Sequence, residues 1–114
     1  MMRKNQLSTL LTCFSFVSGA SAGSVGRAPT EYDGPYEPYR ATLIADGWKP
    51  FPDERAEPCE AYMTWCQSRD ERVDCKISGP LPECTWRWIK GRSIRVVATT
   101  IEQDWVISVA TFPR

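Results

Sequence analysis

Histidine is absent from all 114 residues of the chain. Catalysis by a Ser-His-Asp triad or a Cys-His pair, and any metal site with imidazole ligands, are therefore excluded. Acid–base catalysis by carboxylates remains available, and two acidic groups in the middle of the chain are candidates for it: Glu54, Glu57 and Glu60, and Asp70, Glu71 and Asp74. Acidic side chains are mostly exposed in folded proteins, so we predict a solvated loop and no catalytic residue, metal or cofactor.

Closely spaced cysteine pairs are also missing. Four cysteines follow Cys13, separated in turn by six, eight and eight residues: Cys59, Cys66, Cys75 and Cys84. Structural zinc sites and thiol redox motifs need closer pairs, so we interpret the four as two disulfides. Three pairings are possible. Short loops close at the lowest entropic cost, which favours Cys59 with Cys66 and Cys75 with Cys84.

No apolar run is long enough to cross a bilayer, which takes roughly 20 residues. Arg3 and Lys4 precede an apolar segment at 7–17, and small residues end at Ala22. This order is typical of a signal peptide over residues 1–22. We therefore predict an exported protein, periplasmic or extracellular, without a transmembrane span. Lipid attachment at Cys13 stays open as an alternative, since the residues before it match such a site loosely.

A basic excess is absent as well. The chain has 14 basic and 14 acidic residues; removing residues 1–22 takes two basic residues and no acidic ones, which leaves 12 against 14 and a net charge of −2. This balance argues against general nucleic-acid binding. The 92 residues that remain are enough for one domain, which we expect to be monomeric.

The predicted fold class is α+β, with one short helix packed on a three- or four-stranded antiparallel sheet and a disulfide-stapled loop. Residues 23–35 contain several glycines and prolines and are expected to be a flexible leader, mobile or loosely docked, before a single domain at 36–114. Pro38 in a first turn and Gly47 as a stop predict a helix over 37–46. The prolines after Trp48 indicate an extended segment at a sheet edge or in a loop. Residues 53–83 are expected to form an irregular loop.

Three runs rich in β-branched and aromatic residues predict strands: 84–89, 93–100 and 105–111. If residues 90–92 form a three-residue loop, Trp86 pairs with Val96, whereas a two-residue loop would set Trp86 against Arg95. We expect the longer loop, because it keeps the tryptophans beside apolar partners and leaves Arg95 on the opposite face. The face under the helix would then carry eight residues: Trp86, Trp88, Ile94, Val96, Ala98, Trp105, Ile107 and Val109.

Basic residues gather around the predicted hairpin and form a possible binding surface: Arg87, Lys90, Arg92 and Arg95. Because the middle of the chain is acidic, this group could meet an anionic polymer or an acidic partner protein. Trp65 is added to the surface, since flat aromatic faces stack on sugar rings and the predicted core does not need it. An ordinary charged hairpin and a core tryptophan are the alternative interpretations.

One set of residues in the chain forms a familiar pattern: Tyr39-Arg40, Leu43-Ile44, Gly47-Trp48, Pro50, Cys75, Gly79, Cys84, Trp86 and Trp88. With these residues, the chain from Tyr39 to Val109 resembles a small exported proteobacterial domain of unknown function. The resemblance implies export but supplies no catalytic or binding residue. Residues 76–79 depart from the Gly-Thr-Gly loop expected there.

From these observations we expect a noncatalytic binding module of the cell envelope. Its partner would be an unknown envelope protein or an anionic or polysaccharide ligand. Two alternatives stay open: a carboxylate-dependent hydrolase, and a protein inhibitor of an envelope enzyme.

Overall fold

The computed structural model describes residues 27–114 of the chain. The signal peptide expected at 1–22 and the alternative lipid site at Cys13 lie outside the described residues. Within residues 27–114, no helix has both the length and the apolar character needed to cross a membrane.

One α-helix, α2 (Tyr36–Ala45), forms where the sequence predicted a helix over 37–46. Pro38 lies in the first turn, where its missing N–H costs no helical hydrogen bond. At the other end, the N–H groups of Asp46 and Gly47 bond to carbonyls of the last turn. Gly47 has a φ of +94°, a conformation that favours glycine. The helix prediction is confirmed, with both boundaries one residue earlier than expected.

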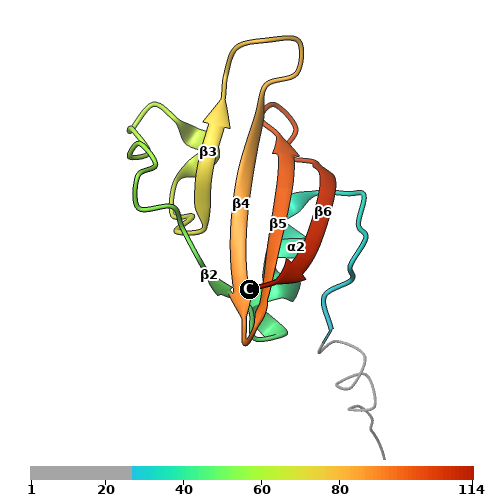
Figure 1. Cartoon of the computed structure of the whole chain (residues 1–114). Helices are drawn as coiled ribbons and strands as arrows, with labels where there is room; N and C mark the ends of the chain where they lie inside the picture. The colour runs from blue at the N-terminus through green and yellow to red at the C-terminus, as the bar shows by residue number, and fades with distance from the viewer. Residues whose placement is uncertain (1–26) are drawn as a thin grey trace, which may run out of the picture.

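Five antiparallel strands form one sheet: β2 (Lys49–Pro50), β3 (Arg72–Lys76), β4 (Glu83–Lys90), β5 (Ser93–Thr100) and β6 (Val106–Pro113). The order is β2-β4-β5-β6, and β3 also pairs with β4 (Figure 1). The α+β class is therefore confirmed, but three or four strands were too few. The missed strand is β3, which lies inside the segment expected to be irregular, and a short 3₁₀ turn at Thr64–Cys66 precedes it.

The β4–β5 hairpin turns on two residues, so the predicted three-residue loop was wrong. Lys90 pairs with Ser93, which leaves only Gly91 and Arg92 in the loop. Gly91 has a φ of +59° and Arg92 does not share this positive φ. A positive φ at the first loop residue alone is the pattern of a type II′ turn, which matches the twist of the strands.

This register changes which side chains lie under the helix. Trp86 pairs with Val97 and Trp88 with Arg95, so Arg95 shares the buried face with the tryptophans. Thr99 is buried on the same face, where its hydroxyl accepts a 2.8 Å hydrogen bond from Nε1 of Trp86. Trp86 and Trp88 are buried as predicted and Val109 packs against the core. The β5 part of the predicted face was wrong, because the shorter loop turns Arg95, Val97 and Thr99 inward in place of Ile94, Val96 and Ala98.

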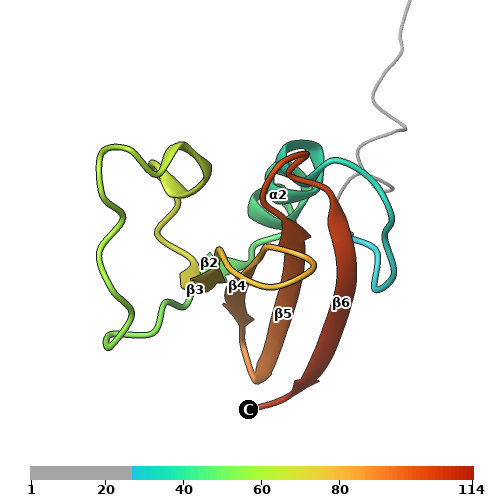
Figure 2. The same ribbon diagram turned by 90° about the horizontal axis from the view of Figure 1, so that it is seen from above.

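The core lies between α2 and one face of the sheet. Its largest members are aromatic and come from the helix, the segment after it and β4: Tyr36, Tyr39, Trp48, Trp86 and Trp88. Figure 2 shows α2 on one side of β4, β5 and β6, with the cysteine-rich segment extending to the side of the sheet. Trp105 and Ile107, expected in the core, are exposed instead.

Residues 27–35, which we call the N-terminal strap, cross the inner face before α2 begins. The N–H of Ala28 donates to Asp46 at 2.9 Å, and the hydroxyl of Tyr39 donates to the Pro29 carbonyl at 2.6 Å. Farther along, the Gly34 carbonyl accepts a 2.7 Å hydrogen bond from the N–H of Val106. The described part of the expected leader therefore contacts both the helix and β6.

Two disulfides hold the segment before β4, Cys59–Cys66 and Cys75–Cys84. This is the pairing favoured from the cysteine spacing, and it is confirmed. Cys75 and Cys84 lie directly opposite each other on β3 and β4, so their bond ties neighbouring strands. The bond between Cys59 and Cys66 closes a turn within residues 53–71, which we call the cysteine loop.

Candidate functional site

The structure separates the five residues of the predicted binding surface. Lys90 and Arg92 lie at the hairpin turn, but Arg87 points to the outer sheet face, where it donates to the carbonyls of Phe51 and Pro52. Arg95 points to the inner face and is buried. Trp65 lies in the cysteine loop, packed against the core. Only Lys90, Arg92 and Arg95 therefore stay near one another.

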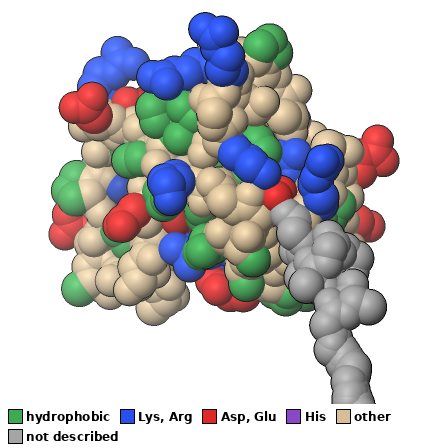
Figure 3. Space-filling view, turned by 90° about the horizontal axis from the view of Figure 1, so that it is seen from below, with side chains coloured by type: hydrophobic (Ala, Val, Ile, Leu, Met, Phe, Trp, Pro, Cys, Tyr) green, Lys and Arg blue, Asp and Glu red, His purple; other side chains and the backbone are tan. Residues whose placement is uncertain are grey.

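A broader group of exposed basic residues takes the place of the predicted surface at this end of the sheet. It comes from the strap, β2, the hairpin and the end of β6, and we call it the basic end: Arg27, Lys49, Lys90, Arg92 and Arg114. Figure 3, which looks onto the end with the β4–β5 turn, shows Lys and Arg side chains gathered on it. The potential over this end is therefore positive although the whole chain is neutral.

A groove of about 450 Å³ opens into the basic end. The strap, the residues after α2 and the β4–β5 hairpin line it: Arg27, Ala28, Thr30, Asp46, Trp48, Lys90, Gly91, Ser93 and Arg95. We call it the basic groove, because three of these residues are basic and one is acidic. Its volume lies within the roughly 300–1,000 Å³ range of small-ligand sites.

Arg95 forms the inner wall of the basic groove and is 4% exposed. Its Nε donates to the Thr111 hydroxyl at 2.8 Å. Its Nη1 lies 3.2 Å from the carbonyls of Ala28 and Pro29 and from the Tyr39 hydroxyl. The guanidinium also lies over the indole of Trp48, 4.5 Å from the ring centroid. Among residues 27–114, no carboxylate hydrogen-bonds this buried cation.

Asp46 is the one acidic residue of the groove, and it already has three partners. It accepts hydrogen bonds from the Ala28 N–H, from Nε1 of Trp48 and from Nζ of Lys90 at 2.9, 3.1 and 2.8 Å. Burial alone would raise the pKa of Asp46, but these hydrogen bonds outweigh it and lower the pKa below its ordinary value. Asp46 therefore stays charged and neutralises Lys90, and Arg27 and Arg95 remain as the positive charges of the groove.

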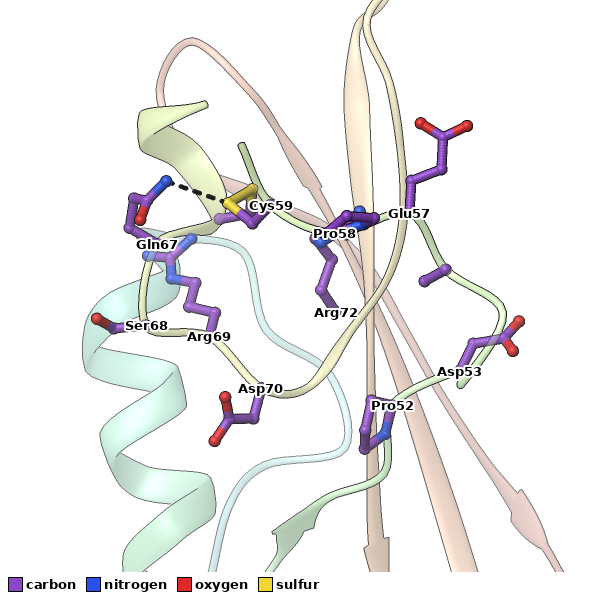
Figure 4. Close-up of a pocket in the computed structure, with 12 residues that line it drawn as sticks. Pro52, Asp53, Glu57, Pro58, Cys59, Gln67, Ser68, Arg69, Asp70 and Arg72 are labelled. Atoms are coloured by element: carbon purple, nitrogen blue, oxygen red, sulfur yellow. Dashed lines mark hydrogen bonds between the residues drawn. A yellow bond between two sulfur atoms is a disulfide. The ribbon is translucent and has the colours of Figure 1, made fainter. Parts of the chain in front are cut away.

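The acidic candidates for catalysis do not converge. Of these candidates, Glu57 and Asp70 line a hollow of about 370 Å³ in the cysteine loop, together with Asp53, which was not among them. Figure 4 shows their carboxylates on different sides of the hollow, pointing away from one another. A pair of carboxylates that divide the acid and base roles needs to face one substrate, and these three do not.

Glu71 is fully buried and is used to hold the fold together. Arg40 contacts both of its carboxylate oxygens, at 2.6 and 3.2 Å, and the Tyr36 hydroxyl donates to it at 2.8 Å. The Tyr36 oxygen in turn accepts from Nε1 of Trp88 at 3.2 Å. Burial, with the negative charge of Glu71, raises the pKa of Tyr36 far above its ordinary value. These contacts join α2, the cysteine loop and β4, and they leave Glu71 no access to a substrate.

Trp65 borders a second hollow, of about 250 Å³, beside the cysteine loop. Its Nε1 is the one buried side-chain polar atom without a hydrogen-bond partner within residues 27–114. Its partly buried ring packs against the core instead of lying flat on the surface. Trp65 therefore does not offer the open aromatic face that sugar stacking requires.

The strap and the residues after α2 supply the part of the site that the sequence did not indicate. Arg27, Asp46 and Trp48 meet the hairpin only through tertiary packing, because 67 positions separate Ala28 from Arg95. The one available signal was Arg95 itself, a cation placed inside a β-rich run.

Comparisons with known proteins found no matching family model, no matching curated protein and no matching solved structure. Within the described residues, 27–114, no group of three or more acidic or cysteine side chains is arranged to hold a metal ion. Arguments about function therefore depend on the geometry of the site.

Proposed function

We propose that this protein is an exported, noncatalytic binding module of the cell envelope that recognises an anionic partner through its basic end. The observation that carries the proposal is the gathering of exposed Lys and Arg side chains from four separate segments onto one end of the sheet. Such a field attracts anions and speeds their association, in a way that salt weakens.

The disulfides support export, and the rigidity of the scaffold supports a binding role. Disulfides persist in oxidising compartments outside the cytoplasm, and this domain has two of them. The carboxylate-dependent hydrolase finds less support, because Glu71 is neutralised by Arg40 and the acids of the cysteine-loop hollow face apart. The five strands and two disulfides supply a rigid scaffold, which lowers the entropic cost of binding.

One observation favours the protein inhibitor as a second candidate. Tyr62, in the loop closed by Cys59–Cys66, and Ile77 and Leu81, in the loop closed by Cys75–Cys84, are exposed apolar side chains. Apolar side chains presented on a constrained loop are a common way to engage another protein.

The experiment compares retention of the protein by cell-envelope fractions at low and high salt. Arg92→Glu reverses a charge at the basic end, and Arg55→Glu makes the same change at a highly exposed position in the cysteine loop. The proposal expects Arg92→Glu to weaken salt-sensitive retention and Arg55→Glu to leave it unchanged. Equal retention of both variants would contradict it. Loss of retention on Tyr62→Ser alone would favour the inhibitor.

A further inference from the structure

The described residues do not use every hydrogen-bond donor of the buried Arg95 guanidinium. Nε and Nη1 are satisfied within the protein, whereas Nη2 makes no hydrogen bond with the described residues. Arg95 lines the basic groove, so a ligand held there would lie beside this guanidinium.

A buried cation without an anion is costly, since its charge has left water and gained no ion pair. The carbonyls and the Trp48 ring compensate Arg95 in part, but each of these partners is uncharged. Asp46 is nearby and already binds Lys90. An anionic group in the groove would lie beside the guanidinium of Arg95 and the exposed Arg27.

The other lining groups narrow the kind of anion. Thr30 and Ser93 add hydroxyl groups, which both donate and accept hydrogen bonds. The indole of Trp48 is only 6% exposed, so it adds a narrow apolar edge to the groove. An extended acidic peptide would normally be held by main-chain hydrogen bonds along a sheet edge. This groove lies at the end of the hairpin and not along an edge, which disfavours a peptide ligand.

We infer that the basic groove is a binding site for an acidic sugar, whose oxyanion contacts Arg95 and Arg27 and whose hydroxyls face Thr30 and Ser93. The inference rests on the proposed function, since it names the ligand class for the basic end. A carboxylate or a phosphate on the sugar would supply the same oxyanion chemistry.

The test is an NMR titration of the protein purified from cells, in which the indole N–H resonance of Trp48 is followed. The probes are a hexuronate trisaccharide, a hexose 6-phosphate, the neutral hexose and triglutamate. We expect the uronate or the sugar phosphate to shift this resonance until the site is saturated. The probe with the lower Kd identifies the oxyanion as a carboxylate or a phosphate. Saturation by neutral hexose or tighter binding of triglutamate would overturn the inference.

Arg27→Gln and Arg92→Gln make a matched pair of variants, because both remove one exposed charge and only Arg27 lines the groove. The Kd of the preferred probe should rise about threefold to fivefold for Arg27→Gln, as for one exposed charge contact, and stay constant for Arg92→Gln. Arg95→Lys should weaken binding further, but it also disturbs the strap, so Arg27→Gln decides the matter.

Failure of this inference and failure of the proposed function give different results. If Arg27→Gln and Arg92→Gln weaken sugar binding equally, the groove is not the site and the basic end still binds anions. If no probe binds and the envelope retention does not depend on Arg92, both proposals are wrong.

Discussion

Replacing Glu71 by Gln removes the negative charge that joins α2, the cysteine loop and β4. Glu71 is fully buried, and its partner Arg40 has a side chain that is 21% exposed. Breaking a buried ion pair on one side costs about 3–5 kcal/mol. Because Arg40 keeps some contact with water, and the new amide oxygen can still accept from Tyr36, we expect the lower end, about 3 kcal/mol.

For a domain of this size, such a loss lowers the melting temperature by about 12–24 °C. The assay is urea unfolding of the unreduced protein, followed by tryptophan fluorescence, with a lower midpoint and an unchanged slope as the expected result. Asp53→Asn is the matched control, because Asp53 faces the highly exposed Arg55 and its loss should leave the midpoint where it is.

The ion pair also predicts coupling between its two members. Arg40→Gln alone should destabilise the protein, since it leaves the buried carboxylate of Glu71 with too few partners. The double variant should lose less than the two single losses combined. A loss below about 1 kcal/mol for Glu71→Gln, or simple additivity with Arg40→Gln, would refute the argument that this contact holds the three elements together.

Asp46→Asn should destabilise the protein at neutral pH, because the hydrogen bonds to Asp46 lower the pKa of its carboxyl group in the folded state. The difference in unfolding free energy between the variant and the parent protein should disappear as the pH falls below the unfolded-state pKa of about 3.9 and through the lowered folded-state pKa. A gap that persists at the lowest pH would contradict this. Trp88→Ala should cost about 3–5 kcal/mol in thermal melting, since the ring is fully buried, and Trp105→Ala, at 39% exposed, should cost much less. Removing Cys75–Cys84 by two serines should cost about 2–3 kcal/mol in urea unfolding; an unchanged midpoint would show that β3 stays paired without it.

Local signals were enough to predict much of the fold. Pro38 and Gly47 marked the ends of α2 because each has a backbone requirement that acts within one turn. The β-branched runs marked β5 and β6, and near-neighbour closure indicated both disulfides. Strand β3 was missed because residues 72–76 carry alternating charges, and their pairing with β4 depends on a partner about ten residues away.

The sheet register failed for a different reason. Choosing the three-residue loop assumed that a buried face admits only apolar side chains, and Arg95 and Thr99 violate that assumption. Thr99 is satisfied by Trp86, and Arg95 by carbonyls of the strap, a segment some 66 positions earlier. Partners so distant in sequence leave no local trace. The same distance explains why the basic groove could not be predicted, although two of its three basic lining residues, Lys90 and Arg95, were named.

The strap also sets the order in which the chain can fold. Asp33 accepts a hydrogen bond from the indole of Trp105, 72 positions later, and Gly34 accepts one from the N–H of Val106. The first described residues can therefore reach their final places only after synthesis has passed Val106, and contacts of such long range form slowly. The strap therefore cannot close on a growing chain until nearly all of it has been made, and for a protein that we propose to be exported, this closure takes place beyond the membrane.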